Sequence, residues 1–118
     1  MATSKSAWTD FERKVARQDW GSERMPLSGM NSRHGGGDVI IPADMDVLVE
    51  CKYRALHAHH TLLKDAQIDA AKHGKKFAIL YTKTKYAEGW VVTLDGSLWH
   101  DIISLPQVQE LLKTKEKE

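Results

Sequence analysis

The chain has 118 residues, of which 42% are hydrophobic and 28% are charged. This length and composition predict a single soluble globular domain over residues 1–118, and they exclude a disordered or fibrous protein and a second catalytic module. The formal net charge of +1 lacks the large basic excess of proteins that coat nucleic acid, so any contact with DNA depends on how the charges are distributed.

Helical periodicity marks the N-terminal segment. Trp8, Phe11 and Val15 recur at helical spacing, and Gly21 supplies a stop signal. The pattern predicts a helix that buries these three side chains and ends before Gly21.

Extended segments follow in the next thirty or so positions. The pattern of residues 23–27 predicts a short extended segment, and that of residues 28–37 predicts a polar, glycine-rich loop of low intrinsic order. Residues 38–41 and 47–53 are two β-rich runs separated by the spacing of a hairpin. The second run is nearly all apolar up to its glutamate, which predicts a strand buried on both faces and central in its sheet.

The second half of the chain alternates helical and extended patterns. Helical spacing returns over residues 60–73, and residues 77–82 and 90–94 read as two further strands joined by a turn. A capping signal with a proline predicts a C-terminal helix over about residues 105–116. The order α, β-β-β, α, β-β, α predicts an α/β fold with a central mixed β-sheet flanked by helices.

Cysteine content and hydrophobic runs indicate where the protein works. The single Cys51 can form no internal disulfide, and no apolar run approaches the ~18 residues of a membrane span. The N-terminal sequence MATSKSAW lacks the apolar core of a signal peptide. We therefore expect a cytoplasmic protein, of a cell or of a phage-infected host, with no membrane partner.

The residues with most chemical potential surround Asp38 and the run Glu50-Cys51-Lys52. Eleven residues separate Asp38 from Glu50, and strand alternation places Glu50 and Lys52 on one face with Cys51 on the other. In a hairpin, Asp38 would lie near Glu50, so that two carboxylates and an ammonium converge. These carboxylates and the backbone carbonyl of Cys51 are suited to bind Mg²⁺, with Mn²⁺ as a substitute, and Glu12 is a further candidate ligand.

Such a group of residues is suited to phosphodiester hydrolysis. A bound cation supplies an acidified water and neutralises the phosphate, and Lys52 is placed to orient the attacking hydroxide. The plainer alternative is that Asp38 ends the loop, Glu50 and Lys52 pair on an exposed strand, and Glu12 belongs to a helix cap. The apolar setting VLVECKY argues against this alternative, because a charged pair there is costly unless it is partnered or binds a metal.

The ordered combination of these residues resembles the PD-(D/E)xK nucleases, with Gly37 where that family has proline. Within the group it is similar to the archaeal-type and phage Holliday junction resolvases, over about residues 8–94. Their pattern is a glutamate in the first helix, an arginine followed after three residues by a serine, a glycine-rich loop, an aspartate, and E-x-K. It reads here as Glu12, Arg24 and Ser28, Gly35–Gly37 with Asp38, and Glu50 with Lys52.

The resemblance implies a restriction-endonuclease-like core and a Mg²⁺-dependent endodeoxyribonuclease. It implies a homodimer that binds four-way DNA junctions and makes paired, symmetric nicks, leaving 5′-phosphate ends. Paired cuts on a junction with two-fold symmetry require a dimer with the same symmetry. Ser28 would lie in the loop near the cleaved strand, as a catalytic and DNA-binding residue, and Arg24 would contact phosphate. The loop is expected to close over the junction. The other candidate DNA-binding residues are Arg33, Arg54 and Gln67.

Alternatives remain open at this point. Related nucleases with the same core cut flaps or duplexes, and the standalone virus-type repair-like (VRR-type) nucleases carry a glutamine after E-x-K, a part that Gln67 can take. A non-catalytic DNA-binding module that kept the fold is the other class. The histidines at 57, 59 and 60 do not predict a zinc site, because such sites normally use four spaced ligands including Cys. Trp99 and the C-terminal leucines fit a dimer surface or plain core packing.

Overall fold

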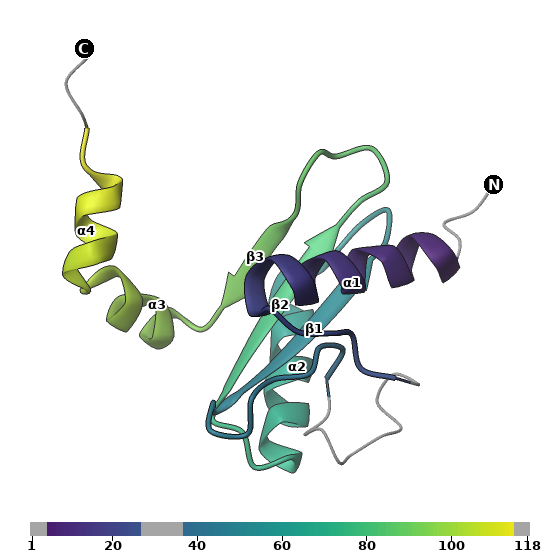
Figure 1. Cartoon of the computed structure of the whole chain (residues 1–118), viewed down its shortest axis with the longest axis horizontal. Coiled ribbons are helices and arrows are strands. Elements are labelled where there is room, and N and C mark those ends of the chain that lie inside the picture. Colours follow the sequence, from purple (N-terminus) through teal and green to yellow (C-terminus); the bar gives the residue numbers. More distant parts are fainter. Residues whose placement is uncertain (1–4, 27–36, 115–118) are drawn as a thin grey trace.

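Figure 1 shows the computed structural model, which describes residues 5–26 and 37–114. These residues form an α/β fold with one three-stranded mixed sheet. The elements in chain order are α1 (Lys5–Trp20), β1 (Val47–Tyr53), α2 (His59–Lys72), β2 (Phe77–Lys83), β3 (Val91–Leu94), α3 (Gly96–Ile103) and α4 (Pro106–Leu112).

The sheet has the strand order β1-β2-β3. β1 and β2 run parallel, with Val47 opposite Phe77 and Tyr53 opposite Lys83, and α2 provides the crossover that a parallel pair requires. β2 and β3 run antiparallel, as the turn between them allows. The mixed sheet expected from the sequence is confirmed.

The two long helices cover opposite faces of the sheet, with α1 in front and α2 behind in Figure 1. Phe11 and Val15 of α1 pack with Val49 and Cys51 of β1 in one buried cluster. A second cluster on the other face contains Leu48, Ala66, Ala70 and Ala78. Because strand side chains alternate, Glu50 and Lys52 share the face of Leu48, toward α2, and Cys51 faces α1. α1 ends at Trp20, and the following Gly21 has a φ of 60°, in the left-handed region, as its stop signal predicted.

The predicted hairpin between residues 38–41 and 47–53 is wrong. Val39 instead pairs with Arg24 in an isolated antiparallel bridge, in which Met25 N donates to the Asp38 carbonyl at 2.7 Å. β1 is therefore an edge strand, and β2 occupies the centre that the sequence analysis gave to β1. β1 stays buried because α1 and the segment around Asp38 cover it in place of another strand.

The C-terminal region also differs from the prediction. The expected helix over residues 105–116 is the shorter α4, and a separate helix, α3, precedes it. The Asp95 side chain caps α3 by accepting a hydrogen bond from Ser97 N at 2.8 Å. α3 and α4 pack against each other and stand away from the sheet in Figure 1. No helix in the described part of the chain is long and apolar enough to cross a membrane.

Candidate active site

Asp38 is tied to the outer edge of β1 through its backbone and its side chain. Its N–H donates to the Val49 carbonyl at 2.8 Å, and its Oδ2 accepts from Cys51 N at 2.7 Å. Gly37 makes this approach possible, because a Cβ at this position would lie 2.8 Å from the Val49 carbonyl oxygen. The φ of Gly37 is +79°, which a proline ring, with φ near −65°, cannot adopt.

Glu12 and Arg24 form an ion pair beside Asp38. Glu12 is only 6% exposed, and its Oε1 accepts from Arg24 Nε at 3.1 Å. The backbone of Arg24 is held by the bridge to Val39. A cavity of about 430 Å³ opens here, lined by Trp8, Thr9, Glu12, Arg24, Asp38, Cys51 and Lys52. This one cavity is therefore lined by four of the residues selected from the sequence: Glu12, Arg24, Asp38 and Lys52.

Cys51 contributes its backbone to this cavity. Its carbonyl oxygen accepts from Trp8 Nε1 at 3.2 Å, and a carbonyl has a second lone pair that remains open to another partner. The thiol is fully buried on the α1 face, and burial raises its pKa so that it stays protonated. Only the backbone of Cys51 is thus suited to meet a cation.

Glu50 and Lys52 line a second cavity, of about 460 Å³, between β1 and α2. Lys52 borders both cavities, so its side chain lies at the boundary between them. The second cavity is also lined by Arg54, Asp65, Asp69 and Lys72, together with Leu62, Ala66 and Ile68. Asp65 and Asp69 of α2 were not predicted from the sequence. Their spacing of four residues, each one position before a buried alanine, is the signal that places them next to β1.

The carboxyl groups of the site are held in surroundings that disfavour their charge. Burial and the neighbouring Asp38 charge raise the pKa of Glu50 to about 8, against the opposing effect of Lys52. Burial also raises the pKa of Asp38, although the Cys51 N–H and Lys52 oppose it. The pKa of Glu12 is raised by burial and by Asp38, in spite of its bond to Arg24. Burial is therefore the main cause of the raised pKa values, and the nearby positive charges of Arg24 and Lys52 oppose it only in part.

The donor set fits a cation that keeps part of its water shell. Among the described residues, no group of three or more His, Cys, Asp or Glu side chains is arranged to hold a metal ion. Mg²⁺ does not require such a group, since it is commonly bound through one or two carboxylates plus waters and phosphate. Asp38, Glu50 and the Cys51 carbonyl are suited to that role. The histidines are used elsewhere: His57 Nε2 lies 3.0 Å from the Lys83 carbonyl and His59 Nε2 lies 3.1 Å from Thr82 Oγ1.

Other predicted residues lie apart from this group. Gln67 borders a different cavity and donates to Asp95 Oδ2 at 3.4 Å, so the structure does not bring it to Glu50. Arg54 is exposed at the rim of the Glu50 cavity. Ser28, Arg33 and the expected closing loop up to residue 36 lie outside the described residues.

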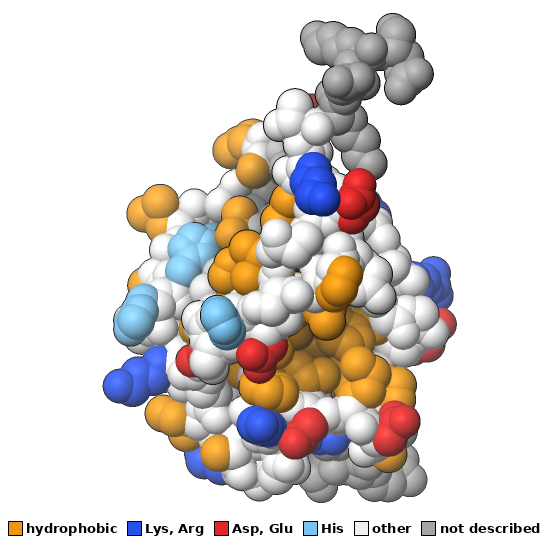
Figure 2. All heavy atoms as spheres, turned by 90° about the vertical axis from the view of Figure 1, so that its left-hand side faces the viewer, with side chains coloured by type: hydrophobic (Ala, Val, Ile, Leu, Met, Phe, Trp, Pro, Cys, Tyr) orange, Lys and Arg blue, Asp and Glu red, His pale blue; other side chains and the backbone are white. Residues whose placement is uncertain are grey.

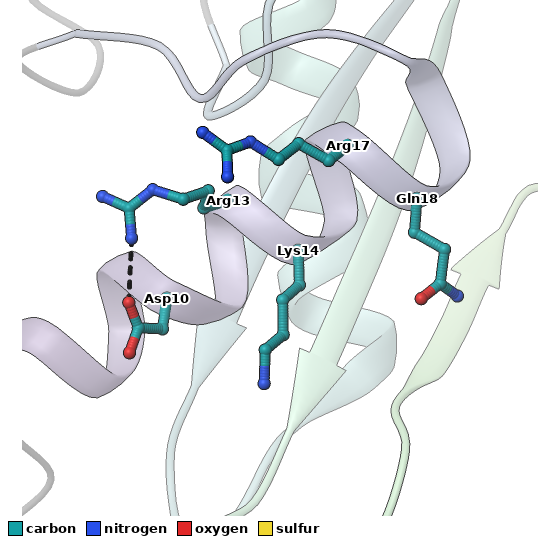
Figure 3. A pocket seen from close by; sticks show the side chains of 5 residues that line it. All are labelled: Asp10, Arg13, Lys14, Arg17 and Gln18. Atoms are coloured by element: carbon teal, nitrogen blue, oxygen red, sulfur yellow. Dashed lines mark hydrogen bonds and ion pairs between the residues drawn. The ribbon is translucent and has the colours of Figure 1, made fainter.

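A basic depression lies on α1 itself. Figure 3 shows Arg13 and Arg17 one helical turn apart on α1, with Lys14 next to Arg13 and extending in another direction. Together with Asp10 and Gln18 they line a hollow of about 430 Å³. Arg13 Nη1 pairs with Asp10 Oδ1 at 2.8 Å, and Arg17 Nη2 pairs with a Glu23 oxygen at 3.3 Å. Both pairs are exposed, so each contributes little to stability and can exchange for another anion. The depression is suited to phosphate groups.

Comparisons of the chain with protein-family models, with curated proteins and with solved structures find no match.

Proposed function

We propose that the chain is a metal-dependent endonuclease of the PD-(D/E)xK type that resolves four-way DNA junctions as a homodimer. The proposal is carried by the position of Lys52, which borders both the cavity of Asp38 and the cavity of Glu50 at the edge of β1. Buried Glu12 lines the Asp38 cavity, and the Asp38 charge acts on Glu50 from across this boundary. Burial raises the pKa values of these carboxyl groups, and carboxyl groups with shifted pKa values cluster at functional sites. A restriction-endonuclease-like core is part of the proposal.

Each residue has a role in phosphodiester hydrolysis. Asp38, Glu50 and the Cys51 carbonyl would hold Mg²⁺ or Mn²⁺, which supplies an acidified water and charge neutralisation at the phosphate. Lys52 orients the water oxygen for attack on phosphorus and stabilises the added negative charge. The P–O3′ bond breaks, the 3′ oxygen leaves and takes a proton from solvent, and the 5′-phosphate remains. Glu12 holds Arg24 at the cavity, where the guanidinium can bind a phosphate oxygen.

DNA binding draws on residues around this centre. The basic depression of α1 and the exposed Arg54 would bind backbone phosphates. Ser28 and Arg33 remain predicted contacts to the cleaved strand. We expect the activity in the cytoplasm, of a cell or of a phage-infected host.

Three other interpretations are separable by experiment. A VRR-type nuclease uses a glutamine near the carboxylates, and the position of Gln67 beside Asp95 gives that reading no support. A flap or duplex nuclease would share the chemistry proposed above and differ in substrate. A non-catalytic DNA-binding module would bind junctions without cutting them.

The direct test compares a labelled four-way junction with a linear duplex of the same sequence, each incubated with the full chain and Mg²⁺. We expect paired nicks placed symmetrically across the branch point and little cutting of the duplex. Equal cutting of both substrates would show that the protein is a duplex nuclease rather than a resolvase. Binding without any cutting, with either Mg²⁺ or Mn²⁺, would replace the nuclease by a binding module.

A further inference from the structure

A pocket of about 310 Å³ lies between α1 and the carboxyl ends of β1 and β2. We call it the aromatic pocket. The lining residues that matter here are Phe11 and Lys14 of α1, Tyr53 of β1, Lys83 of β2, and Trp90 just before β3. Tyr53 and Lys83 are the last register pair of the two parallel strands. Ligands of α/β proteins commonly bind outside the carboxyl ends of parallel strands, and the pocket occupies such a place.

Three aromatic rings form the apolar part of the pocket. Phe11 is only 2% exposed, so it forms the floor. The centre of its ring lies 6.1 Å from that of Tyr53 and 5.7 Å from that of Trp90. Tyr53 and Trp90 pack against the core and still keep part of their surface exposed. The pocket therefore offers aromatic surface on which a planar ring can stack.

Lys83 brings a positive charge into the pocket, which core packing of the aromatic rings does not require. Its Nζ donates to the carbonyl of Thr84 at 3.2 Å and to that of Ala87 at 2.6 Å. The same ammonium lies 5.8 Å from the centre of the Tyr53 ring. Because an ammonium has three N–H donors, one donor remains for a ligand, and the two carbonyls hold the group in place.

Lys14 adds a second positive charge at the rim of the pocket. It is exposed and lines both the aromatic pocket and the basic depression of α1, and Figure 3 shows it extending in another direction from Arg13. Asp10 also lines the pocket, but it is paired with Arg13 at 2.8 Å. The positive lining disfavours a cation, which aromatic surfaces can also bind, and favours a planar ring that carries an anion.

Other hollows of the molecule differ in character. The Asp38 cavity contains one Phe, Tyr or Trp ring, that of Trp8, and the Glu50 cavity contains none. Figure 2 shows the side of the molecule that carries α3 and α4, where hydrophobic side chains surround a hollow. The described lining of the cavity at the base of α3 is mostly polar and has no Phe, Tyr or Trp. The aromatic pocket thus specifies its ligand more closely than these do.

We propose that the aromatic pocket binds one unpaired nucleotide of a DNA strand, with its base stacked on Trp90 and Tyr53 and its phosphate on Lys14. The inference rests on the proposed function, since it takes DNA as the ligand. A volume of about 310 Å³ is at the lower end of the range for ligand pockets, which suits one nucleotide and excludes a duplex. Stacking of bases on aromatic side chains beside a basic groove is how proteins hold single strands.

The pocket adjoins both the basic depression and the candidate active site. It shares Asp10 and Lys14 with the depression. Tyr53 follows Lys52 in the chain, and Phe11 precedes Glu12, and both Lys52 and Glu12 line the Asp38 cavity. Extruding a base costs least where its pairing is already weak, as at the branch point of a junction. A base held in the pocket would therefore fix the branch point relative to the cleaved phosphate.

The test measures the affinity of the full chain for two four-way junctions without a divalent cation, so that no cleavage is involved. One junction carries an unpaired thymidine at the branch point, and the other carries an abasic residue at the same position. We expect the wild type to bind the thymidine junction about tenfold more tightly, and Trp90→Leu to lose this preference. The matched control is Trp99→Leu, since Trp99 of α3 is 45% exposed and lies outside the pocket; it should keep the preference. Equal binding of the two junctions by the wild type, or an unchanged preference in Trp90→Leu, overturns the proposal.

A photochemical measurement on the wild type keeps the test decisive even where Trp90→Leu folds poorly. The unpaired thymidine is replaced by 5-iododeoxyuridine, the complex is irradiated, and the crosslinked peptide is identified by mass spectrometry. We expect attachment to Tyr53 or Trp90. Attachment solely to residues outside the pocket would refute the placement of the base.

Competition with free dTMP separates a strand-borne nucleotide from a free one. We expect no displacement of the thymidine junction below millimolar dTMP, because the free nucleotide has no further phosphates to place on the basic depression. Displacement at micromolar dTMP would overturn the assignment to a DNA strand. A lost thymidine preference together with intact junction cleavage would refute the pocket alone, whereas a preference without any cleavage would support the pocket and refute the nuclease.

Discussion

The outer edge of β1 and the C-terminal arm, residues 96–112, contrast in the kind of side chain that each buries or exposes. At the β1 edge, charged groups are buried: Glu12 is 6% exposed, and burial raises the pKa of Glu50 to about 8. On the arm, apolar groups are exposed, as Leu111 is at 75%. Buried charge and clustered exposed apolar surface are both costly alone. The single chain therefore leaves both regions incomplete. Under the proposed function a cation and phosphate would meet the carboxyl groups at β1, whereas the apolar groups of the arm are left exposed.

The largest effect should come from substitutions of the carboxyl groups at the β1 edge. We expect Asp38→Asn and Glu50→Gln each to lower junction cleavage by about a hundredfold or more, because each removes charge stabilisation from the transition state. DNA affinity should change little, because neither residue supplies a phosphate contact. Single-turnover cleavage and junction-binding titrations check both statements. Asp44→Asn, an exposed aspartate in the same stretch, is the control, and wild-type turnover by Glu50→Gln would remove Glu50 from the site.

Gly37→Ala should disturb the β1 edge through the backbone. A Cβ would meet the Val49 carbonyl at 2.8 Å, and the φ of +79° adds strain. We expect a loss of about 2–3 kcal/mol in unfolding free energy together with lower cleavage, because Asp38 is displaced. Gly89→Ala isolates the strain, since φ is +71° there and no atom lies within 4 Å of the added Cβ; its loss should be about 1 kcal/mol. Equal losses for the two variants would show that the close approach of Gly37 has no energetic weight.

The pH dependence of stability tests the burial of Glu50 at the β1 edge. The folded-state pKa of Glu50, about 8, lies above its ordinary value of 4.5, so the protonated form stabilises the fold. This stability is present below pH 4.5 and is lost as the pH rises toward 8. For the metal-free protein we expect the free energy of unfolding to fall by roughly 2 kcal/mol over this pH range. An isolated group would contribute ~1.4 kcal/mol for each unit of pKa difference, and the effect is smaller here because neighbouring carboxyl groups titrate with Glu50. Urea unfolding at several pH values measures it, and Glu50→Gln should flatten the curve. The arm variant Leu111→Glu should leave its slope unchanged.

The smallest effect is expected on the arm. Leu111→Ala at nanomolar concentration should change the melting temperature by no more than a degree or two, because substitutions at exposed positions usually shift stability by less than about 0.5 kcal/mol. At high concentration the wild type should melt higher than the variant, since association stabilises the folded chain. A variant that melts several degrees lower even at nanomolar concentration would show that the arm packs on its own subunit.

The sequence predicted those parts of the site that depend on local periodicity. Strand alternation correctly separated Glu50 and Lys52 from Cys51, and helical spacing correctly buried Phe11 and Val15. The alternation did not predict which helix covers the face of Glu50, and Asp69 of α2 on that face was missed.

The remaining features depend on contacts that periodicity does not encode. The hairpin prediction was wrong because the backbone of Val39 pairs with that of Arg24. The Cys51 N–H donates to the Asp38 side chain, where the hairpin would have supplied a strand. α3 was missed although Asp95 and Ser97 carry its capping signal. The leucines of α4 indicated an apolar face, but their spacing alone says nothing of whether that face is covered.

A cation titration tests the central claim most directly. The full chain is titrated with Mn²⁺ in the absence of DNA at pH 8, with binding followed by calorimetry. The account predicts saturable binding by the wild type, loss of at least tenfold in affinity in Asp38→Asn and in Glu50→Gln, and no loss in Asp44→Asn. Binding that is absent from the wild type, or that persists unchanged in both carboxylate variants, would contradict the assignment of Asp38 and Glu50 as the metal site.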